Sequence, residues 1–391
     1  MLSQELIDWL RLVLTPEIGS RRGKSLLEKF KTPKAILEAS LGDIAEVENV
    51  GWEVAKRIVE GRGKVDLERQ IKLIERNNIR LIPSDSEFYP ANLKAIYDPP
   101  LVLFVKGEIL PQDYFSIAIV GTRLASFYGR TMSEKLSSQL AEKGFTVVSG
   151  GARGIDTFSH RAALRAKGRT LAVLGCGLDI TYPPDNKKLF DEIAEHGALI
   201  SEFPLRTEPE KGNFPMRNRI ISGLSLGVVV IEAPHKSGAL ITVTHANEQG
   251  REVFSVPGHA DSFVSKGTNQ LLREGAKLVE SADDIIEELE PILISKIAEF
   301  KNNQLEPDQK ERNPFVLGER KMQSDPESGD KAACVAGVEE QVYSLLRADP
   351  VCLDEMVEKT NLDIPRLSGI LLRLQIKKLI RQVSGNQFVA C

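Results

Sequence analysis

Short apolar runs alternate with amphipathic stretches between residues 81 and 290, and this alternation constrains the fold more than any other feature. Each of the runs SIAIV at 116–120 and GVVVIEA at 227–233 contains at least four consecutive apolar residues. Continuous apolar runs are typical of strands buried on both faces, and strand–helix repetition places such strands in parallel. We therefore predict a doubly wound, mostly parallel α/β sheet over residues 81–288. Further strands are expected at 146–149, 170–175, 198–203, 252–258 and 277–281, and one or two more within 81–115.

The first 80 residues, 1–80, have a helical pattern and contain a weak internal repeat. Gly19 matches Gly51 and Lys24 matches Lys56, each in an apolar–glycine pair followed by a helix. The repeat predicts tandem helix-hairpin-helix units, in which the hairpin glycine lets backbone N–H groups meet a DNA phosphate. Two ordinary turn glycines in a small helical domain explain the same pattern, and both interpretations stay open.

The chain after the predicted sheet divides into a polar segment and a compact end. Residues 289–337 are rich in acids and low in hydrophobicity, so we expect a flexible linker there. From residue 338 the pattern predicts three helices, followed by two short strands around Ser384-Gly385-Asn386. Three helices and a terminal hairpin predict a winged helix over residues 338–391. The helices are expected at 338–347, 353–360 and 364–377.

Composition excludes several classes of protein. The net charge of -4 argues against a globally basic nucleic-acid binder, although a local basic patch is enough for phosphate contact. The four cysteines have no metal-ligand spacing, and no apolar run approaches the ~20 residues of a membrane span. The N-terminus has no signal-peptide core. We therefore expect a cytoplasmic protein with reduced thiols and no membrane contact.

The glycine-rich segments do not fit a nucleotide cofactor. GSRRGKS at 19–25 has one residue too few for a P-loop, and GCGLDI at 175–180 has Ile180 where a dinucleotide site needs a third glycine. The five histidines fall in no hydrolase or metal motif. Asp156 and Glu232 lie near strand ends and could act as acid or base, but we favour capping or structural roles. We therefore expect no cofactor, no metal and no catalytic residues.

Small and basic residues follow two of the predicted strands. Gly121-Thr122-Arg123 come after the run at 116–120, and Gly150, Gly151 and Arg153 come after the run at 146–149. In a doubly wound sheet, ligands bind beyond the carboxyl ends of the strands, where small residues let the backbone approach a ligand. An anion there would meet a guanidinium group and a helix N-terminus together.

The segment KGNFPMRNRI, which begins at Lys211, concentrates positive charge around an aromatic ring. It carries Arg217 and Arg219 with Phe214 between the cations, and we expect it to lie just before a helix containing IISGLS. Cations for the phosphates and an aromatic face for a base are typical of a single-strand binding site. The alternatives are that Phe214 packs under Pro215 and that Arg219 makes a structural ion pair.

Five segments in this order resemble the DprA/Smf family, the DNA-processing proteins of bacterial natural transformation. They read GTRLASFYG, VSGGARGID, NFPMRNRIISGLS, SGALIT and VPG. The resemblance implies an extended Rossmann fold that binds single-stranded DNA without catalysis. It also implies a homodimer that loads the RecA recombinase onto DNA and displaces, or shares DNA with, single-stranded-DNA-binding protein.

The resemblance also implies roles for individual residues. Arg123 corresponds to the family's phosphate-binding arginine, while Lys211 and Phe214 correspond to a lysine and an aromatic residue that contact DNA. Arg217 and Arg219 fall in the same signature, but whether they touch DNA or hold the segment in shape stays open. The predicted DNA-binding residues are Gly121, Thr122, Arg123, Gly150, Gly151, Arg153, Lys211, Asn213, Phe214, Arg217 and Arg219.

Two other functions remain as alternatives. Nucleotide phosphoribohydrolases share the extended Rossmann type and carry a PGGxGTxxE motif. The nearest stretch here, APHKSGALITVTHANE, lacks the glycine pair, and its Glu248 is too far along. A duplex-binding regulator is the other alternative, because residues 364–391 contain no acid, although a protein partner fits the winged helix equally well. The basic residues there are Arg366, Arg373, Lys377, Lys378 and Arg381.

Overall fold

The computed structural model divides the chain into two compact units, Met1–Leu305 and Glu306–Cys391. It describes residues 2–303, 338–346, 351–352, 356, 359–360, 370–371, 374, 380–383 and 387–390. In this described part of the chain, no helix is both long enough and apolar enough to cross a membrane.

A nine-stranded sheet forms the centre of the first unit, with the strand order β1-β2-β6-β5-β4-β3-β7-β8-β9. Strands β3 to β9 pair in parallel, while β1 pairs with β2 and β2 with β6 in antiparallel fashion. The prediction of a doubly wound, mostly parallel sheet is confirmed, and residues 81–115 supply two strands, as expected. The strands are β1 (Arg80–Pro83), β2 (Val102–Gly107), β3 (Ser116–Val120), β4 (Thr146–Ser149), β5 (Thr170–Val173), β6 (Ala198–Ser201), β7 (Gly227–Val230), β8 (Glu252–Ser255) and β9 (Lys277–Leu278).

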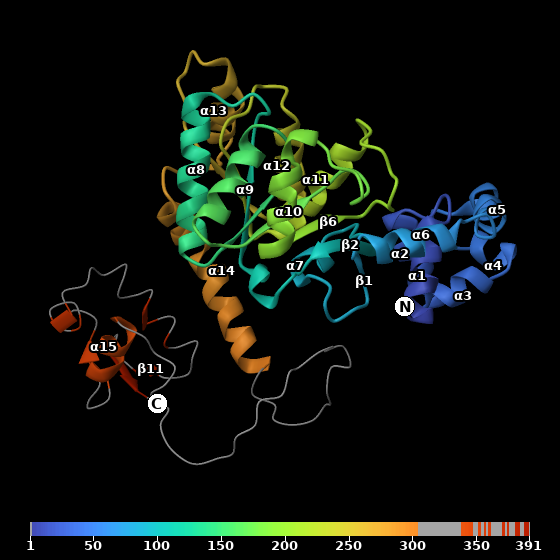
Figure 1. Ribbon diagram of the computed structural model, residues 1–391, viewed down its shortest axis with the longest axis horizontal. Helices are drawn as coiled ribbons and strands as arrows, with labels where there is room; N and C mark the ends of the chain where they lie inside the picture. Colours follow the sequence, from blue (N-terminus) through green and yellow to red (C-terminus); the bar gives the residue numbers. More distant parts are fainter. Residues whose placement is uncertain are drawn as a thin grey trace. The chain divides into compact units, whose positions relative to one another are not determined.

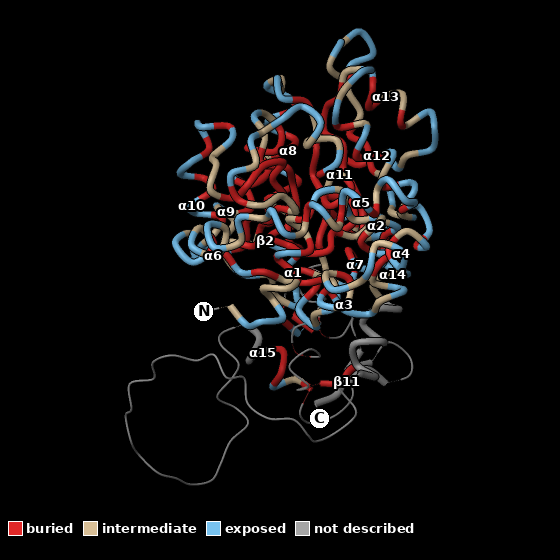
Figure 2. The backbone as a smooth tube through the Cα atoms, turned by 90° about the vertical axis from the view of Figure 1, so that its right-hand side faces the viewer, coloured by how far each residue is buried: buried red, intermediate tan, exposed pale blue. Residues whose placement is uncertain are grey.

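Both faces of the sheet are buried, as the continuous apolar runs require. Ile117 and Ile119 of β3 pack into a core with α8, α9 and α14, whereas Ala118 and Val120 pack into a second core with α7, α11 and α12. Helices therefore cover both sides of the strands (Figure 1), and the backbone at the centre of the first unit is buried (Figure 2). The helices are α7 (Ala91–Lys94), α8 (Phe127–Glu142), α9 (Ile155–Arg165), α10 (Lys187–His196), α11 (Asn213–Leu224), α12 (Gly238–Glu248), α13 (Lys266–Arg273) and α14 (Ala282–Asn303); short 3₁₀ turns are η1 (Pro111–Tyr114), η2 (Pro184–Asn186) and η3 (Phe263–Ser265).

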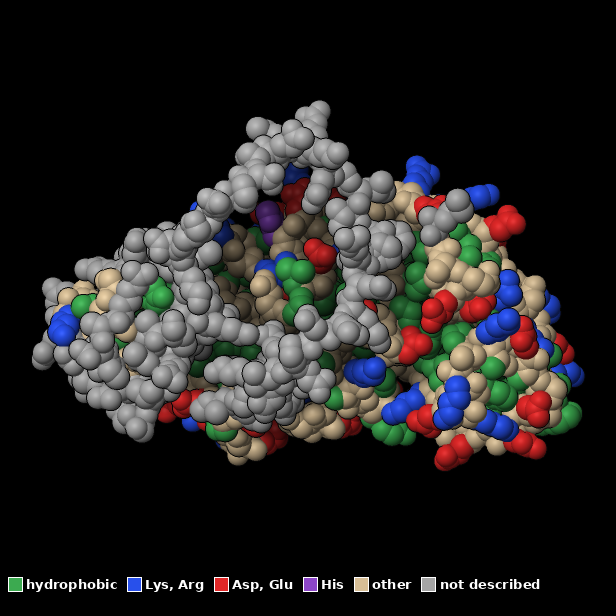
Figure 3. All heavy atoms as spheres, turned by 90° about the horizontal axis from the view of Figure 1, so that it is seen from below, with side chains coloured by type: hydrophobic (Ala, Val, Ile, Leu, Met, Phe, Trp, Pro, Cys, Tyr) green, Lys and Arg blue, Asp and Glu red, His purple; other side chains and the backbone are tan. Residues whose placement is uncertain are grey.

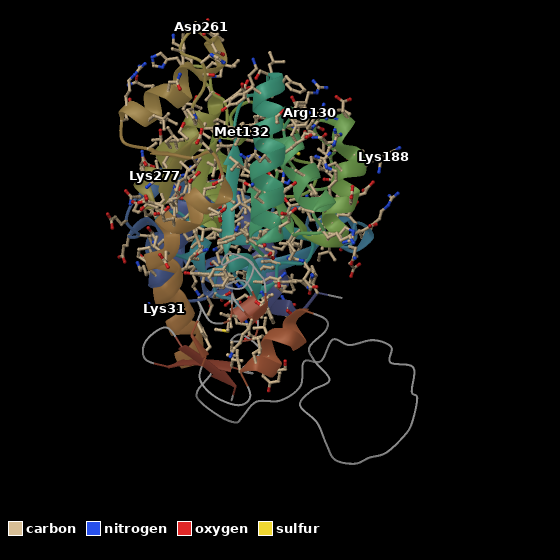
Figure 4. All side chains as sticks on the ribbon, turned by 90° about the vertical axis from the view of Figure 1, so that its left-hand side faces the viewer. Lys31, Arg130, Met132, Lys188, Asp261 and Lys277 are labelled. Carbon is tan, nitrogen blue, oxygen red and sulfur yellow. The ribbon has the colours of Figure 1, made fainter. Side chains whose placement is uncertain are left out.

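Helix α8 shows how a covering helix divides its side chains between sheet and solvent. Met132 is buried in the core under this helix, while Arg130 is exposed and pairs with Glu134 at 3.1 Å (Figure 4). Ser126 caps the N-terminus of this helix, because its side chain accepts a hydrogen bond from the Gly129 N–H and so satisfies a free donor there. The helix start is therefore fixed at the carboxyl end of β3.

The N-terminal region is helical, as predicted, and packs on the edge of the sheet. Its core is continuous with that of β2, because Gly23 lies so close to Leu101 that an added Cβ would be 2.2 Å from the Leu101 side chain. On the face seen in Figure 3, acidic and basic side chains are interspersed over these helices, so charge of one sign does not gather there. The helices are α1 (Gln4–Leu14), α2 (Ser20–Phe30), α3 (Pro33–Glu38), α4 (Leu41–Ala45), α5 (Gly51–Gly61) and α6 (Leu67–Arg76).

The last helix of the first unit continues beyond the point where we expected a linker. Helix α14 ends at Asn303, whereas the linker was predicted to begin at 289. Ile285 and Leu289 are buried and Ile292 packs against the same core, which is the spacing of one helix face. We did not predict this part of the helix because the segment is rich in acids. Residues 304–337 of the predicted linker lie outside the described residues.

The second unit contains a small antiparallel sheet in the order β10-β12-β11 and a core that includes Val342, Leu346 and Phe388. The predicted hairpin around residues 384–386 is present as β11 and β12, whereas β10 was not predicted. The expected helices at 353–360 and 364–377 fall mostly outside the described residues, as do four of the five basic residues named above. The elements are α15 (Val338–Leu345), β10 (Val351–Cys352), β11 (Ile380–Val383) and β12 (Gln387–Ala390).

Candidate nucleic-acid interface

The loops after β3 and β4 touch each other beyond the carboxyl ends of the strands. The Ile155 N–H donates to the Thr122 carbonyl at 3.2 Å. Gly154 has a φ of 78°, and an added Cβ there would be 2.4 Å from the Thr122 carbonyl oxygen. Only glycine combines this left-handed backbone with so close an approach. The contact fixes the position of Arg123, the next residue along.

Arg123 and Phe214 lie together in the structure, although 91 positions separate their numbers. The guanidinium carbon of Arg123 is 5.2 Å from the centroid of the Phe214 ring. Arg123 is exposed and Phe214 is half-buried. A cation over an aromatic face at this distance contributes roughly 0.5–1 kcal/mol at an exposed site. The structure therefore brings together the two residues that the sequence predicted to bind a phosphate and a base.

Tyr182 is a second aromatic residue at this point, and our sequence analysis missed it. Its ring centroid is 5.6 Å from that of Phe214, with the ring planes tilted by 41°, and the side chain is 39% exposed. Gly175 lies beneath Phe214, because an added Cβ there would be 3.1 Å from the phenylalanine ring. A search for aromatic residues after every predicted strand would have found Tyr182, which follows β5. We call Arg123, Tyr182 and Phe214 the Arg123 patch.

The segment KGNFPMRNRI is the start of a helix, so our expectation that it precedes the helix is wrong. Helix α11 begins at Asn213, and its first residues include Phe214 and Pro215. The first four N–H groups of a helix have no partner within the helix, so proline is tolerated there. The Asn213 side chain donates to the Glu208 carbonyl at 3.2 Å, and Lys211 is exposed just before the helix.

Arg217 is buried beneath the Arg123 patch. Its guanidinium group donates to the carbonyl of Gly150 at 2.6 Å and to the carbonyl of Val173, so it joins α11 to the ends of β4 and β5. Burial lowers the pKa of Arg217 to about 10, and the nearby Asp156 carboxylate opposes that shift. Only 4% of Arg217 is exposed. In this arrangement the side chain binds backbone carbonyls of the protein.

Arg219 is also buried, and it makes the ion pair that the sequence left as an alternative. Its two terminal nitrogens are 2.9 and 2.7 Å from the carboxylate oxygens of Glu202. Its Nε is 3.3 Å from Asp98, and Nη2 is 3.4 Å from the Ser20 hydroxyl. These partners lie on three separate segments, so Arg219 joins α11 to the sheet and to α2.

The glycines after β4 make room for protein side chains. An added Cβ at Gly150 would be 2.6 Å from an Asp156 oxygen and 2.7 Å from Arg217. Gly151 has a φ of 64° and lies against the Phe190 ring. Our sequence interpretation gave these glycines the role of letting a ligand approach, but the space beside them is filled. Arg153 is exposed and paired with Asp185, at 2.7 and 3.0 Å from one oxygen.

The two acids near the strand ends are buried and hydrogen-bonded to groups of the adjacent loops. Asp156 accepts a hydrogen bond from the Ala152 N–H at 3.2 Å, and burial raises its pKa although Arg217 opposes the rise. Glu232 is 2% exposed and accepts hydrogen bonds from the backbone N–H and the hydroxyl of Ser126. Among the described residues, no group of three or more His, Cys, Asp and Glu side chains could hold a metal ion.

Comparison with known proteins matches both units of the chain. Residues 80–290 match the family DNA recombination-mediator protein A, and residues 326–386 match the DprA winged helix domain. Protein Smf of Synechocystis sp. is 34% identical over 400 residues and covers 99% of each chain. DNA processing protein DprA of Bacillus subtilis is 48% identical over 224 residues, or 57% of this chain and 75% of the relative.

A solved structure agrees with these matches. The X-ray structure of DNA processing protein A (DprA) from Streptococcus pneumoniae aligns with a TM-score of 0.64 and 36% identity. The alignment covers 72% of this chain and 97% of that chain. The predicted fold is confirmed, including the winged helix that the small C-terminal sheet and its family match indicate.

Proposed function

Because the chain belongs to the DprA/Smf family of DNA recombination mediators, we propose that it binds single-stranded DNA at the Arg123 patch. The observation that carries the proposal is the arrangement of Arg123, Phe214 and Tyr182. An exposed guanidinium group from the β3–α8 loop meets the rings of Tyr182, from the segment between β5 and η2, and Phe214, from the first turn of α11. Stacking of bases on aromatic side chains and neutralisation of phosphates by cations are the two main terms in single-strand binding.

The arrangement favours a single strand over a duplex. In a duplex the bases are stacked on one another, so their faces are not available to protein rings, whereas a single strand exposes them. We propose that a base stacks on Phe214 and Tyr182 while Arg123 and Lys211 bind the neighbouring phosphates. Arg153 joins them by exchanging Asp185 for a phosphate, since an exposed ion pair contributes only about 0–1 kcal/mol.

We propose that Arg217 and Arg219 position the site and do not touch DNA. Both side chains are about 95% buried, and both are occupied by carbonyl or carboxylate oxygens of the protein. A side chain in this state would have to break buried hydrogen bonds before it reached a phosphate. Their role in binding is to hold α11 so that Phe214 faces Arg123.

We also propose that the protein acts without catalysis. The acids at the strand ends, Asp156 and Glu232, are buried and hydrogen-bonded to loop residues, which favours a structural role over general acid–base chemistry. In the wider process we propose that the protein works as a homodimer that passes DNA from single-stranded-DNA-binding protein to the RecA recombinase during natural transformation. Membership of a family of recombination mediators supports this role.

The test is the affinity for a fluorescent oligothymidine, measured by anisotropy for the full chain and four variants. Arg123→Ala and Lys211→Ala remove cations, and Phe214→Ala removes the stacking face, for which we expect a loss of roughly 1–3 kcal/mol. Arg165→Ala is the matched control, because Arg165 is an exposed arginine in the last turn of α9, the helix that begins beside the site. Wild-type affinity in the Arg123 and Phe214 variants would overturn the proposal.

A further inference from the structure

A second exposed aromatic residue with two cations lies where the N-terminal helices meet the sheet. Tyr97, between α7 and β2, is 75% exposed. The Arg21 guanidinium carbon is 5.4 Å from its ring centroid, and the Lys24 ammonium is 5.8 Å from it. Both basic residues are exposed on α2. We call Tyr97, Arg21 and Lys24 the Tyr97 patch.

We infer that the Tyr97 patch is a second subsite for the same strand of DNA, so that the nucleic-acid path continues from the sheet onto the N-terminal helices. This inference rests on the proposed function of the Arg123 patch. Tyr97 would stack on a base, and Arg21 and Lys24 would bind the phosphates on either side of it. The chemical groups are those of the Arg123 patch, an exposed aromatic ring with cations at its face.

The two patches are joined by a rigid and buried connection. Arg219 is five residues after Phe214 on α11, or roughly 7–8 Å along the helix axis. From there its guanidinium group reaches Asp98, the neighbour of Tyr97, and Ser20 at the start of α2. The second subsite is therefore held at a fixed position relative to the first.

The local charge favours a polyanion as the occupant. Arg21 is 3.8 Å from Asp98, but that carboxylate is closer to Arg219, at 3.3 Å. Arg219 is also paired with Glu202, so the three cations of this cluster face two carboxylates and one positive charge remains. The Lys24 ammonium also donates to the Tyr97 carbonyl at 3.2 Å, which keeps it beside the ring.

A purely structural role does not explain Tyr97. The N-terminal helices are already attached to the sheet by a continuous apolar core and by Arg219. A side chain that is three-quarters exposed adds little buried area to that attachment. An exposed aromatic ring near cations is, however, the feature that a nucleic-acid base requires.

The experiment compares oligothymidines of two lengths, because only a longer strand reaches both patches. We choose lengths of about 3 and about 20 nucleotides, below and above the range of ~4–16 nucleotides that single binding modules cover. Tyr97→Ala and the double variant Arg21→Ala/Lys24→Ala are compared with Lys56→Ala. Lys56 is exposed at the position of the N-terminal repeat that matches Lys24, and it serves as the control.

We expect Tyr97→Ala to weaken binding of the long strand about 5- to 150-fold, as the loss of one stacked base predicts. The short strand, which the Arg123 patch holds alone, should keep its affinity, and Tyr97→Phe should bind both strands like the wild type. Arg123→Ala should weaken both lengths. Unchanged long-strand affinity in the Tyr97 and Arg21/Lys24 variants would overturn the inference and leave a protein partner as the occupant.

Two further outcomes separate this inference from the proposed function. Equal losses for both lengths in Tyr97→Ala, with a lowered midpoint of thermal unfolding, would mean that Tyr97 only supports the fold, which contradicts the inference. Failure of the wild type to bind either length would refute the proposed function itself.

Discussion

Replacement of Arg217 by methionine separates a positioning role from direct contact with DNA. Methionine keeps most of the apolar volume but removes the donors to Gly150 and Val173. Two buried acceptors without donors cost about 1–3 kcal/mol each. Removal of the buried charge returns some free energy, because burial disfavours the charged form and lowers the pKa of Arg217 to about 10.

Asp156 also affects the stability of the Arg217→Met variant. Its buried carboxylate loses a neighbouring positive charge in the variant, and breaking a buried charge pair from one side costs about 3–5 kcal/mol. We therefore expect Arg217→Met to lower the free energy of unfolding by roughly 3–5 kcal/mol. Arg217→Lys keeps a positive charge, so its free energy of unfolding should lie between that of Arg217→Met and that of the wild type.

The assay is urea unfolding followed by circular dichroism, combined with oligothymidine affinity at several salt concentrations. Arg217→Met should lose stability, and below its unfolding transition its affinity should fall without any change in the salt dependence. Arg123→Ala should lose at most ~1 kcal/mol of stability, and both its affinity and its salt dependence should be reduced, since it removes one phosphate contact. A fully stable Arg217→Met protein whose salt dependence falls as in Arg123→Ala would refute the positioning role.

Two further predictions concern the packing beneath the site. Gly154→Ala should lower the free energy of unfolding by at least ~2 kcal/mol, because φ is 78° and the new methyl group would be 2.4 Å from the Thr122 carbonyl oxygen. The control is Gly238→Ala, which has open space at its Cβ and should keep the stability of the wild type. Thermal or urea unfolding measures both variants. His160 is fully buried, and burial lowers its pKa from 6.5 to about 3. Between these two pH values the unfolded state binds a proton at this residue and the folded state does not. The free energy of unfolding therefore decreases as the pH falls below 6.5. This loss of stability should reach ~2 kcal/mol at pH 5 in the wild type and be absent from His160→Gln. Urea unfolding at pH 7 and pH 5 measures it. An equal loss of stability in both proteins would contradict the prediction.

The sheet and the position of the site could be predicted because both follow from local sequence. The runs at 117–120 and 228–231 are apolar without interruption, and this pattern is typical of strands buried on both faces. Once the strands were in parallel, the rule that ligands bind beyond their carboxyl ends placed Arg123 beside the second loop.

The burial of Arg217 and Arg219 could not be predicted, because the partners of both side chains are distant in sequence. Arg217 binds carbonyls 67 and 44 residues away, and Arg219 binds Asp98, 121 residues away. Sequence therefore showed a cluster of charge but not which charges face inward. The helix start at Asn213 was missed because Pro215 and the flanking charges are also typical of a loop.

Tyr182 was not predicted as a site residue for a different reason. The residue lies in a turn-rich segment between β5 and η2, with no periodicity that would assign it to the core or to the surface. Its significance depends on the 5.6 Å distance to Phe214, which is fixed by the packing of α11 against the ends of β4 and β5. No local pattern encodes such a distance.

The salt dependence of single-strand affinity in Arg123→Ala and Phe214→Ala tests the central claim most directly. For each phosphate contact, the slope of log K against log salt changes by about 0.7 for a single strand. Arg123→Ala should therefore flatten the slope by about that amount, whereas Phe214→Ala should weaken binding at every salt concentration with the slope unchanged. Slopes and affinities equal to those of the wild type in both variants would contradict the account.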